Sequence, residues 1–205
     1  MSFASWVARS MISDGFYAAL DKQQEQVAML LSGAKQVHIT SPLGTDLRLR
    51  IDQRPIHLDR DGIPRGEVYV APHEDSANGV AVIDRAFVGR YLVKQLRLTF
   101  SEGRLADVDA PDPSGAGSLR ELLATSEGDK DIIAEFAIGL NPGVTGPVGI
   151  IALDEKIGGS VHIAIGMNES FGGKNRSNLH LDLVILRPTV WLDDTLTIDN
   201  GVLCG

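Results

Sequence analysis

Two short apolar runs in the C-terminal third restrict the possible folds of this chain more than any other feature. Residues 161–166 read V-H-I-A-I-G, and residues 179–186 read L-H-L-D-L-V-I-L. Short apolar runs rich in Val and Ile, joined by a Gly-rich segment, predict two neighbouring strands. Alternate residues of a strand share a face, so His180 and Asp182 point the same way, about 6–7 Å apart.

The polar residues inside these runs are candidate metal ligands. An ionised Asp within an apolar strand costs several kcal/mol unless it is paired or bound to a metal. Two imidazoles, from His162 and His180, and the carboxylate of Asp182 form a ligand set typical of a metal site. The alternative from spacing alone is that both histidines are hydrogen-bonded core residues and that Asp182 caps a turn.

Composition narrows the class of protein and its partners. The 205 residues are 43% hydrophobic, which suits a globular protein with a sizeable core, and we treat residues 1–205 as one domain. The formal net charge of −8 argues against nucleic acid and against an anionic membrane surface as partners. No apolar stretch could span a bilayer, and the N-terminus lacks the pattern of a secretory signal. The single Cys204 fits a cytoplasmic protein.

Alternating apolar and polar residues predict an α+β fold that is strand-rich and largely antiparallel, with a few helices. Apolar residues at helical spacing predict an amphipathic helix over residues 14–33. Residues 36–40 and 46–51 predict a hairpin. The polar, Pro- and Gly-containing segment 52–66 predicts a loop, with His57 at the surface.

The middle of the chain predicts further strands and two helical segments. Residues 66–72 read as a strand, and three alternating runs between residues 79 and 109 predict an antiparallel meander. A Pro-, Gly- and Ser-rich break at 111–117 precedes a helix that begins at 118–125. A second helical segment or a turn is predicted at 130–137, and the Gly- and Ser-rich residues 168–178 predict a mobile loop able to line a site.

Two acidic residues are difficult to explain as packing. Glu67 stands at the entrance of the 66–72 strand, where it is either solvent-exposed or a ligand directed into a cleft. Glu135 lies in the apolar sequence A-E-F-A-I-G, and a buried Glu there needs a proton, a cation or a metal. We interpret Glu155 and Lys156 as a surface ion pair.

Several short strings, in order and with their spacing, resemble the M29 metallo-aminopeptidases of the aminopeptidase T group. The resemblance covers nearly the whole chain from about residue 25. The strings are T-S-P-L-G-T-D-L (40–47), G-E-V-Y-V-A-P (66–72), E-F-A-I-G-L-N-P (135–142), L-D-E-K-I-G-G-S-V-H-I-A-I-G (153–166), S-F-G-G (170–173) and H-L-D (180–182).

This resemblance implies a cytoplasmic, homodimeric exopeptidase that removes N-terminal residues from small peptides. It implies two divalent ions, such as zinc, cobalt or manganese, roughly 3.5–4 Å apart. The family's metal ligands correspond to Glu67, Glu135, His162, His180 and Asp182, and we also assign a catalytic role to Glu135.

The chain departs from the family pattern in two ways. The N-terminal region before residue 40 is short, so we expect a shortened relative or a domain whose partner is another chain. Better known members of the family carry a Tyr a few residues beyond the first metal-binding His. Here those positions hold Met167, Asn168, Glu169 and Ser170, so no phenol from this segment can stabilise an oxyanion.

Two alternative functions remain open. The scaffold is also similar to that of the dihydroxypyridine dioxygenases, which cleave rings with a single Fe(II). His162, His180 and Asp182 would then form the facial ligand triad of a mononuclear site. A mononuclear site needs neither Glu67 nor Glu135, which favours the hydrolase. The other alternative is a non-catalytic binding module, and the number of bound ions distinguishes the three.

Overall fold

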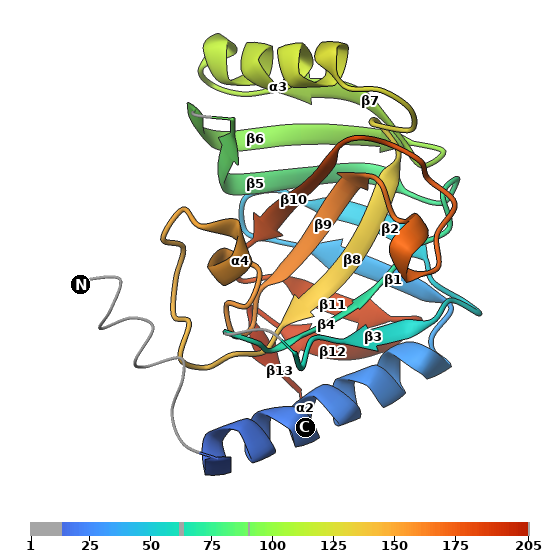
Figure 1. Cartoon of the computed structure of the whole chain (residues 1–205), viewed down its shortest axis with the longest axis vertical. Coiled ribbons are helices and arrows are strands. Elements are labelled where there is room, and N and C mark those ends of the chain that lie inside the picture. The colour runs from blue at the N-terminus through green and yellow to red at the C-terminus, as the bar shows by residue number, and fades with distance from the viewer. Residues whose placement is uncertain (1–13, 62–63, 90, 205) are drawn as a thin grey trace.

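A computed structural model describes residues 14–61, 64–89 and 91–204 as an α+β fold rich in strands, as the sequence predicts (Figure 1). The longest helix is α2 (Asp14–Gly33), which confirms the predicted 14–33 helix and lies against β3 and β4 of the smaller sheet. The shorter helical elements are α3 (Pro113–Thr125), α4 (Ile151–Asp154) and the 3-10 turn η1 (Glu169–Phe171).

The strands form two sheets with antiparallel pairing throughout their ladders. The larger sheet has the order β13-β12-β11-β1-β2-β5-β6-β7, and the smaller one has the order β10-β9-β8-β4-β3. Strands of the larger sheet are β1 (Gln36–Thr40), β2 (Asp46–Arg50), β5 (Asn78–Val88), β6 (Tyr91–Ser101), β7 (Arg104–Asp109), β11 (Thr189–Leu192), β12 (Thr195–Asp199) and β13 (Val202–Leu203). Strands of the smaller sheet are β3 (Ile56–Leu58), β4 (Glu67–Val70), β8 (Ile133–Gly139), β9 (Val161–Gly166) and β10 (His180–Ile185).

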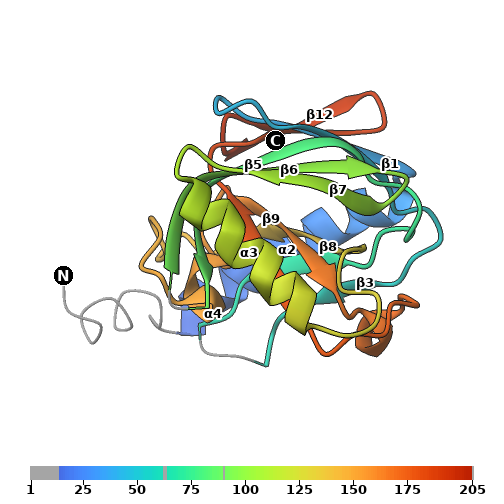
Figure 2. The same ribbon diagram turned by 90° about the horizontal axis from the view of Figure 1, so that it is seen from above.

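The two sheets face each other across one apolar cluster (Figure 2). Leu47 and Leu98 of the larger sheet and Phe136 and Ile163 of the smaller sheet all belong to this cluster. Alternate residues of β8 and β9 therefore point into the core, and the residues between them point to the other face of the smaller sheet. That second face carries the polar residues that the sequence analysis singled out.

The prediction of a helical segment or a turn at 130–137 is wrong for most of these residues, because residues 130 and 131 form a turn but residues 133–139 form strand β8. All seven residues of β8 are buried, so the run shows neither the period of a helix nor that of a half-exposed strand. Pairing with β4 and β9 on either side decides the conformation. Glu135 is thus a strand residue at the middle of a sheet.

The predicted loop at 52–66 and the predicted start of the helix at 118–125 are also wrong in part. Residues 56–58 form β3, which pairs with β4, and His57 is half-buried with its ring stacked on Tyr69 at 5.1 Å. Helix α3 begins at Pro113, because the Asp112 side chain caps it by accepting from the Ser114 backbone N–H at 3.0 Å.

Strand β1 joins segments from opposite ends of the sequence. It forms the predicted hairpin with β2, and on its other edge it pairs with β11, where Val37 lies opposite Leu192. The Asp193 carboxylate strengthens this junction by accepting from the backbone N–H groups of Lys35 at 3.1 Å and Gln36 at 2.9 Å. Across the described part of the chain, every helix is too short or too polar to cross a bilayer.

Candidate metal centre

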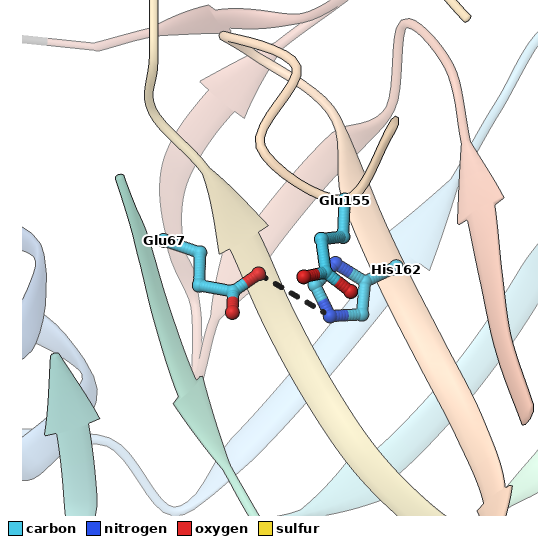
Figure 3. Close-up of side chains that lie close together, drawn as sticks. All are labelled: Glu67, Glu155 and His162. Carbon is cyan, nitrogen blue, oxygen red and sulfur yellow. Dashed lines mark ion pairs between the residues drawn. The ribbon is translucent and has the colours of Figure 1, made fainter. Parts of the chain in front are cut away.

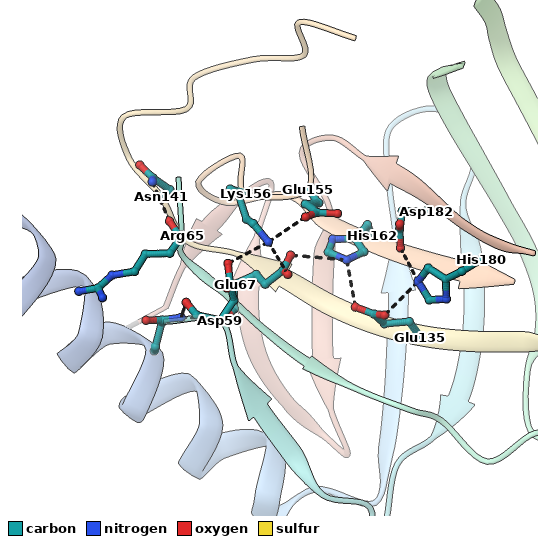
Figure 4. Close-up of polar contacts among 11 residues, drawn as sticks. Asp59, Arg65, Glu67, Glu135, Asn141, Glu155, Lys156, His162, His180 and Asp182 are labelled. Carbon is teal, nitrogen blue, oxygen red and sulfur yellow. Dashed lines mark hydrogen bonds and ion pairs between the residues drawn. The ribbon is translucent and has the colours of Figure 1, made fainter. Parts of the chain in front are cut away.

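The five predicted ligands gather on one face of the smaller sheet, from four adjacent strands (Figure 4). Strand β4 carries Glu67, β8 carries Glu135, β9 carries His162, and β10 carries both His180 and Asp182. Residues that lie opposite each other in neighbouring strands share a face, and the register aligns these side chains. The sequence spacing that suggested a common face for His180 and Asp182 is therefore matched by the structure.

Small residues form the floor between these side chains. Ala164 of β9 lies opposite Glu135 on one side and Asp182 on the other. Ala137 of β8 lies opposite His162 in the same way. Each alanine leaves room above the sheet for the longer side chains on either side to approach one another.

Glu135 is the centre of the polar contacts. Its Oε1 lies 3.3 Å from Nε2 of His162, and its Oε2 lies 3.4 Å from Nε2 of His180. Nε2 of His180 also lies 3.1 Å from Oδ1 of Asp182, and Nε2 of His162 lies 3.7 Å from Oε2 of Glu67 (Figure 3). Two imidazoles and three carboxylates thus face a common space.

The ring of His180 is oriented by its other nitrogen. Nδ1 lies 2.6 Å from the backbone oxygen of Met167, to which it donates a hydrogen bond. This contact leaves Nε2 directed at the carboxylates of Glu135 and Asp182. Such support from a backbone carbonyl is typical of a histidine that binds a metal through Nε2.

Burial and mutual charge set the protonation states in the metal-free chain. Burial alone would raise the pKa of Glu135, but hydrogen bonds from His162 and His180 lower it to about 2. Burial would lower the pKa of both histidines, yet the hydrogen bond with Glu135 raises that of His162 to about 9. For His180, Asp182 and then Glu135 raise the pKa to about 11. At neutral pH without a metal, His162 and His180 are therefore protonated, and their positive charges balance the carboxylates that a bound cation would otherwise balance.

Lys156 supports Glu67 from the side away from the histidines. The predicted surface pair is wrong, because Lys156 is buried and its ammonium contacts three carboxylates (Figure 4). Nζ lies 2.5 Å from Oε1 of Glu67, 2.8 Å from Glu155 and 2.9 Å from Asp59. The sequence alone gave no signal for this burial, because the D-E-K triplet at 154–156 has the composition of a surface segment.

One oxygen of Glu67 has no hydrogen-bond donor among the described residues. Oε1 accepts from Lys156, while Oε2 is buried without a hydrogen-bond partner among the residues that the structure describes. Burial raises the pKa of the Glu67 carboxyl to about 7, although His162 and Lys156 act in the opposite direction. A buried carboxylate oxygen directed toward an imidazole nitrogen fits a metal ligand, because a bound cation would satisfy it.

Two overlapping groups of side chains have the geometry to hold an ion. One consists of Glu67, Glu155 and His162, and the other of Glu135, His162 and Asp182; within each, the ligand atoms lie within 4.8 Å of one another. Nitrogen and carboxylate donors of this kind suit zinc, cobalt, manganese or Fe(II). Glu155 is the member of these groups that the sequence analysis missed.

The segment 168–178 lies beside the site, and its Asn residues anchor it. Nδ2 of Asn168 donates to the Ala134 oxygen at 3.1 Å, and Nδ2 of Asn175 donates to the Ile133 oxygen at 2.9 Å. These oxygens belong to a bulge of β8 next to Glu135, so the bulge and the loop support each other. The anchors attach much of the predicted mobile loop to the sheet.

Aromatic residues border the cluster on the β3 and β4 side. The Phe171 ring meets His180 edge-on at 5.9 Å and Tyr69 edge-on at 5.6 Å. Burial raises the pKa of the Tyr69 phenol, and the negative charges of Glu135 and Glu67 raise it further. The phenol of Tyr69 is therefore close enough to the candidate ligands to feel their charge.

The remaining histidines lie outside the cluster. His73 contacts the backbone oxygen of Asp52 at 2.9 Å, and His38 contacts Asp46 at 2.8 Å. The cationic loop residue Arg176 pairs with Glu169 at 2.7 Å. The five residues predicted as ligands are thus brought together, and His38 and His73 lie apart from them.

Comparison with known proteins gives the same scaffold. A structure of 2,5-dihydroxypyridine dioxygenase from Pseudomonas putida KT2440 matches 98% of this chain and 62% of its own, with a TM-score of 0.80 and 20% identity. Wild-type AmpT from Thermus thermophilus matches 92% of this chain and 55% of its own, with a TM-score of 0.75 and 26% identity.

Sequence comparison adds a curated relative and a family. The 2,5-dihydroxypyridine 5,6-dioxygenase of Pseudomonas putida is 24% identical over 195 residues, which is 84% of this chain and 55% of the relative. The chain therefore spans about half the length of that protein. The family model described as thermophilic metalloprotease (M29) matches residues 16–197. With nearly its whole length covered by that model, the chain belongs to the M29 metalloprotease family.

Proposed function

We propose that this chain is a metal-dependent hydrolase of the aminopeptidase type, which removes N-terminal residues from small peptides or cleaves a related amide. The observation that carries the proposal is the unsatisfied Oε2 of Glu67, which is buried 3.7 Å from Nε2 of His162. A mononuclear site built from His162, His180 and Asp182 has no use for this oxygen. A second ion beside the first would use it.

The chain offers ligands for two positions. Glu67 and Glu155 lie on the Lys156 side of His162, while Glu135, His180 and Asp182 lie on the other side. Glu135 directs one oxygen to each imidazole, so its carboxylate would be available to an ion at either position. Lys156 holds Oε1 of Glu67, so that Oε2 stays directed at the centre of the cluster.

A pair of divalent ions supplies electrophilic polarisation of a carbonyl group and lowers the pKa of a bound water. The protein's own contribution is orientation of ligands and water. Glu135 is assigned the catalytic role because its carboxylate lies between both imidazoles and can accept a hydrogen bond from an attacking water. The surrounding carboxylates also attract the free ammonium group of a peptide N-terminus, which favours an exopeptidase.

One specific observation favours a second candidate, the mononuclear Fe(II) ring-cleaving dioxygenase. His180 and Asp182 are in direct contact at 3.1 Å, and with His162 they give the two-histidine, one-carboxylate set of such enzymes. The 24% identity with a dihydroxypyridine dioxygenase supports the same alternative. In this candidate Glu67 would remain a structural partner of Lys156.

Metal content per chain separates the candidates. Protein purified without oxygen and without a His-tag is analysed for zinc, cobalt, manganese and iron. Two equivalents of the first three metals, with hydrolysis of L-leucine p-nitroanilide, support the hydrolase. One equivalent of iron, with consumption of 2,5-dihydroxypyridine, supports the dioxygenase. No metal before or after reconstitution leaves the non-catalytic binding module.

A matched pair of variants sharpens this test. Glu67→Gln removes a ligand charge at one position only, so a two-metal hydrolase falls from two equivalents to one. Glu25→Gln is the control, because Glu25 is exposed and pairs with Arg60 at the surface, away from the cluster. A mononuclear site keeps its single equivalent in both variants.

The quaternary structure and compartment belong to the same proposal. We propose a cytoplasmic homodimer. Sedimentation equilibrium tests the dimer, and a monomer with full peptidase activity would contradict it.

A further inference from the structure

Tyr69 shares the ligand face of the smaller sheet. It stands two residues after Glu67 in β4, and alternate residues of a strand point to the same side. Tyr69 also lies opposite Ala137 of β8, which in turn lies opposite His162 of β9. The phenol and the imidazole therefore stand on either side of one small residue, roughly 10 Å apart at the backbone. Both side chains lie on the same face of the sheet as Ala137.

The ring of Tyr69 is held by aromatic neighbours. His57 stacks on it, with ring centroids 5.1 Å apart and an interplanar angle of 21°. Phe171 meets it edge-on at 5.6 Å and 78°, and the backbone oxygen of Phe171 lies 3.1 Å from Nε2 of His57. Phe171 also contacts His180, so one ring positions both the phenol and a candidate ligand. Contacts on two sides limit the rotamers of Tyr69.

The hydroxyl of Tyr69 has no hydrogen-bond partner in the described part of the chain, and the residue is half-buried. A phenol is both a donor and an acceptor, and a buried Tyr normally uses this capacity within the protein. Here two neighbouring rings hold the Tyr69 ring, while among the described residues none hydrogen-bonds its hydroxyl, and the charges of Glu135 and Glu67 act on the phenol. This combination describes a preorganised donor for a bound molecule.

We propose that Tyr69 is a catalytic residue, whose hydroxyl donates a hydrogen bond to the substrate oxygen on which negative charge develops. The inference rests on the proposed hydrolase and deepens it. It also supplies a phenol from β4 in a chain that has none in the segment following His162.

The proposed step balances without any oxidant or reductant. The water oxygen forms a bond to the carbonyl carbon, and the carbonyl π electron pair moves to the carbonyl oxygen. The Tyr69 O–H keeps its proton and hydrogen-bonds to that oxygen. When the electron pair returns, the C–N bond breaks, and the amine leaves with a proton given up by the attacking water.

The test compares Tyr69→Phe with Tyr91→Phe on the full chain. Phe at position 69 can keep the ring contacts with His57 and Phe171 and removes only the hydroxyl. Tyr91 is exposed on β6, so its variant controls for the loss of a phenol elsewhere. Three quantities are measured for each protein: metal content, the affinity of the metal-loaded protein for inorganic phosphate, and hydrolysis of L-leucine p-nitroanilide.

We expect Tyr69→Phe to keep the full metal content and to bind phosphate, a tetrahedral oxyanion, at least tenfold more weakly. Its kcat should fall by about 10²–10³, with KM within about twofold, as for removal of one oxyanion donor. Tyr91→Phe should match the wild type in all three quantities.

Equal phosphate affinities in the wild type and Tyr69→Phe would overturn the inference, as would a wild type that binds no phosphate. Loss of metal in Tyr69→Phe would also overturn it, because the hydroxyl would then be structural. A selective loss of phosphate affinity in a protein that hydrolyses no amide would support the donor role while refuting the proposed peptidase activity. The two failures are therefore distinguishable.

Discussion

Replacing Lys156 by Met should show how far the site depends on a buried cation. The side chain of Lys156 is only 6% exposed, and its ammonium is the shared partner of Glu67, Glu155 and Asp59. Met keeps much of the volume but removes the charge, which leaves the Glu67 carboxylate buried without its nearest counterion. Breaking a buried ion pair in this way costs about 3–5 kcal/mol.

The expected loss is large on the thermal scale. For a chain of this size, 1 kcal/mol corresponds to about 2–4 °C in Tm, so Lys156→Met should lower the Tm of the metal-free protein by roughly 12 °C. Glu67 can relieve part of this cost by binding a proton, since its pKa is already raised to about 7. That relief disappears as the pH rises, so the deficit should be greater at pH 8.5 than at pH 6.

Urea unfolding of chelator-treated protein measures the effect, with Lys94→Met as the control because Lys94 is exposed on β6. The double variant Lys156→Met with Glu67→Gln should recover at least about 1 kcal/mol, since it removes both partners of the pair. A Lys156→Met protein within about 1 kcal/mol of the wild type at both pH values would refute the reasoning.

Three further predictions concern the candidate ligands and the contact between Gly139 and the turn that follows α4. His180→Ala should abolish metal binding without unfolding the chain, whereas His73→Ala, outside the cluster, should keep the metal; elemental analysis and circular dichroism decide. Zinc binding at pH 7 should release about two protons, because His162 and His180 have pKa values of about 9 and 11 without metal, so affinity should rise with pH. Calorimetry in buffers of different ionisation enthalpy measures this release, and no release would contradict it. Gly139→Ala should cost about 1–3 kcal/mol and weaken metal binding, because its Cβ would lie 2.3 Å from a backbone oxygen of the turn after α4. Gly33→Ala, whose Cβ would meet nothing within 4 Å, should be near neutral in the same denaturation assay.

The parts of the fold that follow from local patterns were predictable from sequence. Apolar residues at helical spacing gave α2, and alternation gave the β1–β2 hairpin. Strand β8 escaped prediction because all its positions are buried, so its sequence has no period to distinguish strand from helix. Only its two neighbouring strands specify its conformation.

Some residues of the candidate site could likewise be predicted from the sequence, and others could not. The positions of His162 and of His180 with Asp182 could be proposed because a polar residue in an apolar run is costly. The burial of Lys156 could not be predicted, since a D-E-K triplet is typical of surfaces until β4 places Glu67 beside it. The position of Tyr69 near the candidate ligands could not be predicted either, because it depends on the register of three strands, β4, β8 and β9.

The pairing of β1 with β11 has a consequence for the order of folding. Val37 finds its partner Leu192 only after all the residues between them have been synthesised, so the larger sheet depends on contacts of very long sequence separation. Until then one edge of β1 is open, which exposes a nascent chain to intermolecular strand pairing. His180 and Asp182 precede β11 directly in the sequence, so two of the five candidate ligands also emerge late in synthesis. We expect a low contact density during synthesis, and refolding of the full chain that is slow for its size, because the pairing of β1 with β11 closes a very long loop.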